Sequence, residues 1–440
     1  MDYQEKYHLK LTTPDEAVKV ITHKGNMSFG MAVAQPPALL KAVADRARNG
    51  GFEELKVYYL HSEQPAQETI LQYDLMDVIK PHPGFMCKAE KLLLEQGRKE
   101  GRKVVDYVPN SFSQMPRYLT ENIAIDTFIV TVSPMDKSGY FSLGTGNDYG
   151  STVARACKHL IVEVNENMPR VFGGSQIHVS EVESIVENNL PLVEMVPRPP
   201  KPEDEKIGEQ IAKMIPDRAV IQMGIGGVPD AVCRYLQHHK DLGIHSELLS
   251  PGMATLIKQG IVTGKYKQTN PGKHVFTLAF GDKEMYEFMN DNPSMESYAV
   301  SYVNDPAVIA QNDNVISVNS ILNIDLFGQV NAEYMNGHQF GGSGGQNDFV
   351  RGAYMSKGGK SIIAFESSTK GGTISKVVPK LDGIVTDLRL DTQYVVTEYG
   401  SINLKGLSTS ERALGLIGLA HPDFRDELLQ QAKEMQLVGS

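Results

Sequence analysis

The stretch KIGEQIAKMIPDRAVIQMGIGGVPDAVCRYLQHH, Lys206–His239, combines three local patterns in one order. It opens with apolar residues at helical spacing, and AVIQMG is then a short apolar run typical of a buried strand. A glycine turn follows, and Pro229 has a backbone angle that suits the start of a helix. The order helix, strand, glycine turn, helix predicts an α/β fold built on a mostly parallel sheet.

The N-terminal half alternates in a similar way. Apolar runs that end in turn residues predict buried strands in VVDYVPNSF (104–112), IDTFIVTVSPMD (125–136) and KHLIVEVNENMP (158–169). KAEKLLLEQGRKEG (88–101) has a helix-like pattern. Such alternation indicates a mostly parallel sheet covered by helices.

Features of the second half recur in the first. In Thr13–Ala47, as in Lys206–His239, an apolar helix end is followed ten residues later by a turn glycine, and then by a proline that opens a helix. The matched pairs are Val20 to Gly30 and Met214 to Gly224. The tripeptide His-Ser-Glu also occurs in both halves, each time carried by the next predicted strand, whose end is expected near Leu60 in the first half and near Ile244 in the second. These coincidences indicate a weak internal duplication.

The segment MVPRPPKPEDEK, Met195–Lys206, is the predicted domain boundary, because its prolines favour an extended connection. We expect two related α/β domains at 1–197 and 198–440, each an open, mostly parallel sheet covered by helices. The length of 440 residues agrees with two domains.

Composition excludes several classes of protein. A net charge of −10 argues against a nucleic-acid partner, because a phosphate backbone attracts basic surfaces. Cys87, Cys157 and Cys233 are odd in number and widely spaced, so we predict neither a disulfide framework nor a zinc site. Histidines are not spaced as metal ligands, so no metal is expected. Because the sequence has no signal-like start and no run of about 18 apolar residues, we expect a cytoplasmic protein without a membrane span.

A strand, a glycine turn and a helix start together favour an anion site, because free N–H groups and the positive helix end point at the same place. Gly224, Gly226 and Gly227 fit this description. A more specific alternative is a nicotinamide dinucleotide site in which Glu247 binds a ribose. The G-x-G-x-x-G sequence pattern of such sites is incomplete, because Pro229 stands in place of its third glycine.

Glu247, in LGIHSELLSPGM (242–253), follows the predicted strand beside this glycine turn. For most glutamates a solvated turn or a helix start is the ordinary interpretation. Parallel sheets place ligand-binding groups at such strand ends, so Glu247 is a candidate base or covalent nucleophile. His245 shares its strand face and is a candidate acid, base or structural hydrogen-bonding group.

The segment from Gly337 to Gly372 contains ten of the 40 glycines. Such backbone freedom allows either close approach to a ligand or tight turns, and plain turns are the favoured interpretation.

Several motifs resemble the class I coenzyme A transferases, in the branch of the acetyl-CoA hydrolase, butyryl-CoA:acetate and 4-hydroxybutyrate CoA-transferases. They are SQIHVSEVESIVE, GIGGVPDAV, LGIHSELLSPGM, FGGSGGQNDFVRGA, KGGTISKVVPKL and YVVTEYGSINLKGLS, in this order from Gly173 onward. The N-terminal half is more loosely similar, through GMAVAQPPALLKAVA. The resemblance implies two α/β halves of similar fold with the active site in the cleft between them. It also implies a glutamate, matching Glu247, that forms a thioester with coenzyme A.

The resemblance also implies roles for other residues. The residues implied to form a backbone cradle for coenzyme A are Gly224, Ile225, Gly226, Gly227 and Val228. Asn319 and Gly342 are implied to contact coenzyme A as well. A basic residue is also implied, for which Lys405 is the first choice and Arg389 the second. Gly30 and Met31 would face the substrate acid. Glu63 is interpreted as a relic of duplication or a cleft residue. Relatives often have SDG or SDA where this chain has Ser250, Pro251 and Gly252, which leaves the acid open.

The predicted function is transfer of CoA from acetyl-CoA or succinyl-CoA to a short carboxylic acid such as 4-hydroxybutyrate, itaconate or butyrate. Acyl-CoA hydrolysis by the same glutamate is the close alternative, and a non-catalytic ligand sensor is the alternative from another class. The partners are acyl-CoA and small acids, and we expect a homodimer or a higher homo-oligomer.

Overall fold

A computed structural model describes residues 2–195 and 198–439 and divides the chain into two compact units. The first unit comprises Met1–Met195 and Val275–Val303, and the second comprises Val196–His274 and Asn304–Ser440. The expected boundary between residues 197 and 198 adjoins residues 196–197, which lie outside the described ranges. The division differs from the predicted contiguous domain 198–440 in one respect, because the segment 275–303 clusters with the first unit.

Backbone hydrogen bonds explain why the segment 275–303 belongs to the first unit. The amides of Asn147 and Asp148 both donate to the carbonyl of Thr277 at 3.1 Å. The amide of Val300 donates in turn to the carbonyl of Asp148 at 2.8 Å. Contacts of this kind between distant parts of the chain leave no periodic signal in the sequence.

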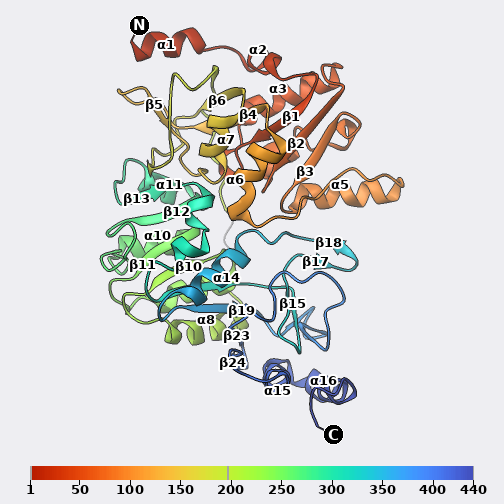
Figure 1. Ribbon diagram of the computed structural model, residues 1–440. Coiled ribbons are helices and arrows are strands. Elements are labelled where there is room, and N and C mark those ends of the chain that lie inside the picture. Colours follow the sequence, from red (N-terminus) through yellow and green to blue (C-terminus); the bar gives the residue numbers. More distant parts are fainter. Residues whose placement is uncertain (1, 196–197, 440) are drawn as a thin grey trace. The chain divides into compact units, whose positions relative to one another are not determined.

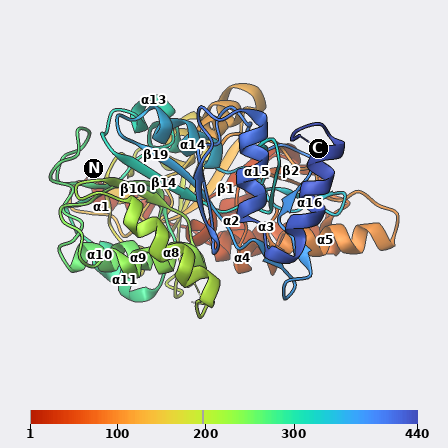
Figure 2. The same cartoon turned by 90° about the horizontal axis from the view of Figure 1, so that it is seen from below.

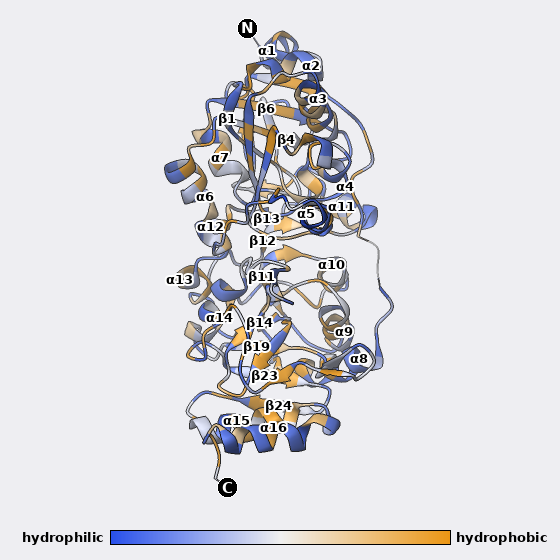
Figure 3. Ribbon diagram, turned by 90° about the vertical axis from the view of Figure 1, so that its right-hand side faces the viewer, coloured by the Kyte–Doolittle hydropathy of each residue, from blue (hydrophilic) through white to orange (hydrophobic). Residues whose placement is uncertain are grey.

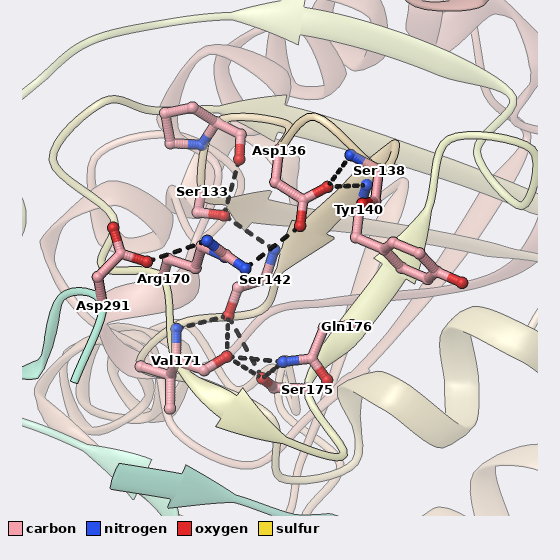
Figure 4. A network of polar contacts seen from close by, with 11 residues as sticks. Ser133, Asp136, Ser138, Tyr140, Ser142, Arg170, Val171, Ser175, Gln176 and Asp291 are labelled. Atoms are coloured by element: carbon pink, nitrogen blue, oxygen red, sulfur yellow. Dashed lines mark hydrogen bonds and ion pairs between the residues drawn. The ribbon is translucent and has the colours of Figure 1, made fainter. Parts of the chain in front are cut away.

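A polar network adds to this attachment (Figure 4). The guanidinium of Arg170 lies 3.1 Å from a carboxylate oxygen of Asp291 and 3.3 Å from one of Asp136. Nearby, the hydroxyl of Ser142 accepts a hydrogen bond from the amide of Val171 and donates one to its carbonyl, both at 3.0 Å. The network therefore ties the segment 133–176 to Asp291.

The first unit is built on six parallel strands in the order β3-β2-β1-β4-β6-β9. They are β1 (Lys24–Phe29), β2 (Glu54–Tyr59), β3 (Ile79–Pro83), β4 (Thr127–Val132), β6 (His159–Val164) and β9 (Ser184–Glu187). Helix α3 (Pro37–Arg48) covers one face, and α6 (Met115–Arg117) and α7 (Gly150–Ala156) cover the other (Figures 1 and 3). The unit also contains α1 (Tyr3–Lys10), α2 (Pro14–Ala17), α4 (Gln64–Gln67), α5 (Lys88–Lys99), α11 (Lys283–Met289), α12 (Val300–Val303), β5 (Tyr140–Ser142), β7 (Phe172–Gly173), β8 (Gln176–His178), β12 (His274–Ala279) and β13 (Met295–Ser297).

The apolar runs explain most of this sheet. Every residue of β4 is buried, as expected for a parallel strand covered on both faces. The predicted strand at 104–112 is wrong, because the structure assigns no strand to these residues. They run extended beside β3 with two backbone hydrogen bonds to it, from Asp106 to Pro81 and from Val108 to Pro83. Pro109 lacks an N–H, so it cannot donate to such a ladder.

In the second unit the strand order is β24-β23-β19-β14-β10-β11, parallel except for the β23–β24 pair. These strands are β10 (Val220–Met223), β11 (Gly243–Leu249), β14 (Val315–Asn319), β19 (Lys360–Ala364), β23 (Tyr394–Thr397) and β24 (Gly400–Asn403). Small strands lie in the connections: β15 (Asn323–Asp325), β16 (Val330–Asn331), β17 (Tyr334–Met335), β18 (His338–Gln339), β20 (Ser368–Thr369), β21 (Ile374–Ser375) and β22 (Val377–Val378).

Helices cover both faces of this second sheet. α8 (Pro202–Met214), α9 (Gly227–Tyr235) and α10 (Pro251–Lys258) lie on one side of β10 and β14, and α13 (Pro306–Ile309) and α14 (Gln346–Met355) lie on the other (Figure 2). The predicted extended connection at Met195–Lys206 is thus wrong from Pro202 onward, because that proline occupies the first turn of α8. The C-terminal helices α15 (Thr409–Leu419) and α16 (Pro422–Glu434) pack on each other.

The two sheets share a strand order. In the first unit β1 pairs with β2 and β4, and β6 and β9 follow on the β4 side. In the second, β10 pairs with β11 and β14, and β19 and β23 follow on the β14 side. The predicted α/β class, with related and mostly parallel sheets covered by helices, is confirmed. In the part of the chain that the structure describes, no helix has the length and apolar character needed to cross a membrane.

Candidate active site

Glu247 lies inside β11, near its carboxyl end. The predicted strand end near Ile244 is wrong, because β11 continues to Leu249. The neighbouring β10 ends earlier, and the two strands pair only at Val220↔Gly243 and Ile221↔Ile244. The same register, continued, brings Glu247 level with Gly224, where β10 has given way to the glycine turn. The carboxyl end of β11 therefore projects beyond β10, in the position where parallel sheets bind ligands.

Two groups from outside β11 hold the Glu247 carboxyl. The side-chain amide of Asn304 donates to Oε2 at 2.6 Å, and the backbone N–H of Gly345 also donates to the carboxyl. Gly345 is the N-cap of α14, so the carboxyl sits at the positive end of a ten-residue helix. Sequence analysis missed Asn304, which carries no local motif.

The last residue of the loop before α14, Gly345, must be glycine. A Cβ built on Gly345 would lie 1.8 Å from Glu247 Oε2 and 2.1 Å from Asn304 Nδ2. Gly344, with φ of +51°, has the left-handed backbone that favours glycine. Interpreting the glycine-dense segment as plain turns is therefore wrong here, because this part of it approaches Glu247 closely.

The surroundings set the charge of Glu247. Burial raises the pKa of its carboxyl to about 7, against the opposing effect of the Asn304 hydrogen bond. The nearby carboxylate of Asp348 adds to the increase in the pKa, and the Gly345 N–H reduces it. A carboxyl with a pKa near neutrality is a recurring property of reactive carboxylic acids.

The predicted glycine cradle is partly open. Space around Gly224 and Gly226 is empty, and Ile225 is 43% exposed. Gly227 instead packs on α8, because a Cβ there would lie 2.1 Å from Asp204 Oδ2. α9 begins at Gly227 rather than at Pro229, and Val228 is buried within it.

The other predicted coenzyme A residues lie in different surroundings. Asn319 ends β14, with its amide nitrogen 3.4 Å from Gln222 Oε1. Gly342 is buried in the loop that leads to Gly345. Lys405 donates to the Leu390 carbonyl and stands 4.1 Å over the ring of Tyr354.

Arg389, the second choice for the basic position, is exposed, and its carbonyl accepts a hydrogen bond from Arg412 at 2.7 Å. The second unit also contains a pocket of about 440 Å³ that sequence analysis did not single out. Its charged lining is mixed, with lysines at 201, 206 and 370, His421, and glutamates at 203, 366 and 398. Lys370 belongs to the KGGTISKVVPKL motif, which was the available signal.

The first-unit residues occupy a corresponding turn after β1. Gly30 has no room for a side chain, since a Cβ would lie 2.4 Å from the Ala34 carbonyl. Met31 is 3% exposed. Glu63 follows β2 as the N-cap of α4, outside the strand, so the two His-Ser-Glu copies have different conformations.

Comparison with known proteins identifies the family. The acetyl-CoA hydrolase/transferase N-terminal domain matches residues 1–197, and the C-terminal domain of the same family matches residues 281–432. The chain belongs to the acetyl-CoA hydrolase/transferase family. It is similar to the 4-hydroxybutyrate coenzyme A transferase of Clostridium kluyveri, with 40% identity over 99% of this chain and 100% of that protein. It is also similar to the succinyl-CoA:cyclohexane-1-carboxylate CoA transferase of Geobacter metallireducens, with 39% identity over 99% and 98% of the two chains.

A solved structure agrees with this assignment. The crystal structure of RipA from Yersinia pestis is 54% identical, covers 100% of both chains and has a TM-score of 0.97. The predicted family is therefore confirmed, and this chain is an enzyme of the acetyl-CoA hydrolase/transferase family. Within the described ranges, no group of three or more histidine, cysteine or acidic side chains is arranged to hold a metal ion.

Proposed function

We propose that this enzyme transfers coenzyme A from an acyl-CoA donor to a short-chain carboxylic acid through a thioester on Glu247. One observation carries the proposal. The Glu247 carboxyl is held between the Asn304 amide and the N–H of Gly345, the N-cap of α14, beside an open glycine turn. A fixed carboxylate in this position suits covalent catalysis, which divides a difficult exchange into two easier ones.

The steps follow from the chemistry of a carboxylate. With Oε2 held by Asn304, we assign the attack on the thioester carbonyl to Oε1. The acyl–sulfur bond breaks, giving a mixed anhydride and CoA thiolate. The thiolate then attacks the glutamyl carbonyl, the donor acid leaves as a carboxylate, and γ-glutamyl-CoA remains. The acceptor carboxylate repeats these steps in reverse, so no proton, electron or further reactant is consumed.

Asn304 and Gly345 have a second role in this scheme. When thiolate adds to the glutamyl carbon, negative charge develops on Oε2, which the Asn304 amide already contacts, and the Gly345 N–H donates to the same carboxyl group. Preorganised N–H donors at a helix start stabilise such a charge without reorganising. The pair therefore both positions the nucleophile and stabilises the charge that forms on it.

Coenzyme A binding is proposed for residues of the second unit. The open turn from Gly224 to Val228 would hold the reacting end of coenzyme A, and Asn319 and Gly342 would contact it. Lys206 and Lys370, in the mixed-charge pocket of this unit, are candidates to contact its phosphates. Lys405 remains the other candidate for that role. Because remote contacts supply binding energy, this tail can help to orient the thioester.

We propose the acceptor acid only as a chemical class, the short-chain carboxylic acids. The two relatives above are named for 4-hydroxybutyrate and for cyclohexane-1-carboxylate, and butyrate and itaconate are further candidates. Acetyl-CoA and succinyl-CoA are the proposed donors. A cytoplasmic homodimer or a higher homo-oligomer completes the proposal.

Turnover measurements with a panel of acids test the proposal. Acetyl-CoA and succinyl-CoA are each supplied with one acid, and the new acyl-CoA is measured by chromatography. We expect product to depend on the acid, and Glu247→Gln to lower kcat by ~10³-fold or more because an amide oxygen is a poor nucleophile. Glu434→Gln, on the exposed face of α16, is the matched control and should behave as the wild type. Thioester loss that is independent of every acid would contradict transfer in favour of hydrolysis.

A further inference from the structure

The start of α14 supplies the Gly345 N–H that donates to the Glu247 carboxyl, so the position of this helix end matters for the nucleophile. The loop that leads to it does not fix that position by itself, because four of its last five residues, 341–345, are glycine. Glycine has more accessible backbone conformations than any other residue, so ordering it costs the most entropy. The helix start therefore needs a contact from elsewhere in the second unit.

The Asp387 side chain supplies such a contact. Its Oδ2 accepts a hydrogen bond from the side-chain amide of Gln346 at 2.6 Å, and its Oδ1 accepts one from the side-chain amide of Asn347 at 3.3 Å. Gln346 and Asn347 are the first two residues of α14. One carboxyl group thus binds both residues that follow Gly345.

Asp387 is itself fixed to a small sheet. Its backbone forms an antiparallel bridge with Val330 in β16, in which the Asp387 N–H donates at 3.2 Å and its carbonyl accepts at 3.0 Å. β16 pairs with β15, and β15 pairs with β22. A continuous path of hydrogen bonds therefore runs from this sheet through Asp387 to the start of α14, which contacts Glu247.

The Asp387 carboxyl is fully buried. Burial raises its pKa to about 6, and the hydrogen bonds from Gln346 and Asn347 oppose the increase. The charged groups that act on it are Asp391, Arg351 and Glu333. Once ionised, the carboxylate has two acceptor oxygens and no proton, so it can receive both amides at once. An apolar residue of similar size would avoid the cost of burying a carboxylate, so packing alone does not explain Asp387.

We propose that Asp387 is a positioning residue for the reaction, which holds the first turn of α14 so that the Gly345 N–H stays on the Glu247 carboxyl. The inference rests on the proposed function of Glu247, and Asp387 acts through Gly345 rather than through contact with a substrate. Without Asp387 the start of the helix can move away from the nucleophile. Small displacements of this kind lower the rate of a reaction strongly.

The rate of adduct formation tests the proposal. Full-length protein at pH 8 is mixed rapidly with acetyl-CoA at several concentrations and quenched in acid, and the coenzyme A adduct on Glu247 is measured by mass spectrometry. Asp387→Leu keeps the side-chain size and removes both hydrogen bonds, so we expect the rate constant at saturating acetyl-CoA to fall by ~10-fold or more. The acetyl-CoA concentration that gives half of this rate should change less than about twofold. A loss of folded protein alone would lower the amount of adduct and leave the rate constant unchanged.

Asp387→Asn is the conservative variant. Its Oδ1 can still accept from Asn347, and its amide can donate to Gln346 once that side-chain amide turns over. We therefore expect a rate constant within about threefold of the wild type.

Asp391→Asn is the matched control, because it removes a carboxylate that binds the same helix from the same loop. Asp391 pairs with the exposed Arg351 at 3.0 Å, one turn further along α14. Exposed ion pairs contribute little, so this variant should react at the wild-type rate.

Thermal unfolding of each variant checks that it is folded. If Asp387→Leu does not fold, Gln346→Met decides the test, because it removes the shorter hydrogen bond, keeps the side-chain length and should slow adduct formation by about threefold or more. A wild-type protein that forms no adduct would contradict the proposed function. If the wild type forms the adduct, the inference about Asp387 alone is overturned when Asp387→Leu reacts at the same rate, or when Asp387→Asn is as slow as Asp387→Leu.

Discussion

At neutral pH the Glu247 carboxyl exists in both protonation states, because its pKa lies near 7. In the proposed mechanism only the carboxylate attacks a thioester, so burial lowers the fraction of enzyme in the reactive form. Asn304 opposes this loss, since its hydrogen bond to Oε2 stabilises the carboxylate. The Asn304 amide is thus the largest effect that opposes burial and keeps part of the Glu247 carboxyl ionised.

This balance predicts a pH profile. For the free enzyme, kcat/KM for acetyl-CoA should rise with pH through about 7, as Glu247 loses its proton. In Asn304→Ala the stabilising hydrogen bond is absent, so the midpoint should move up by about one pH unit. Steady-state rates between pH 5 and 9 measure the midpoint for the wild type and for Asn304→Ala. A lower rate with an unmoved midpoint would assign Asn304 a purely structural role.

The sequence singled out Glu247 as a candidate nucleophile but did not indicate the groups that hold its carboxyl. Glu247 could be singled out because a strand end beside a glycine turn is a local pattern. Asn304 lies 57 residues further along the chain, and a lone asparagine in a loop has no signature. The engagement of Lys405 with Leu390 and Tyr354 likewise depends on side-chain packing that a sequence does not state.

At the scale of elements, the loop that precedes α14 positions Glu247. The loop passes so close to the carboxyl that a methyl group on Gly345 would overlap Oε2. The backbone of Gly345, with φ of −97°, would accept alanine without strain. The requirement for glycine therefore comes from the contact with Glu247 and Asn304.

Gly345→Ala is predicted to lower kcat/KM by ~10²-fold, because the added Cβ displaces the nucleophile. The same overlap should cost about 1–3 kcal/mol of stability. Gly418→Ala is the matched control, since Gly418 lies in α15 with open space around its Cα, and alanine should be neutral or slightly stabilising there. Steady-state kinetics and thermal unfolding of both variants measure these effects. Wild-type activity in Gly345→Ala would contradict the assigned contact.

Elements with a strong local pattern were predicted well, and their ends were not. The apolar runs at 125–136 and 158–169 correspond to β4 and β6, and the segment 88–101 corresponds to α5. β11 runs five residues past its expected end at Ile244 because the end of the strand depends on its neighbours in the sheet, which no local pattern shows.

At the scale of the whole molecule, the repeated strand order supports the duplication that the sequence suggested. Both sheets place the strand before the glycine turn between two parallel neighbours, β2 and β4 in one case and β11 and β14 in the other. The matched glycines and the paired His-Ser-Glu copies were enough to predict related units. The assignment of 275–303 to the first unit was not predictable, because it depends on contacts between segments far apart in sequence.

Mass spectrometry of the whole chain tests the central claim most directly. The protein is mixed with acetyl-CoA in the absence of an acceptor acid, quenched in acid, and analysed intact and after digestion. We predict a mass increase of one coenzyme A less one water, located on Glu247 and absent from Glu247→Gln. An adduct on Glu63, or sustained transfer to an acid by a protein that never carries an adduct on Glu247, would contradict the account.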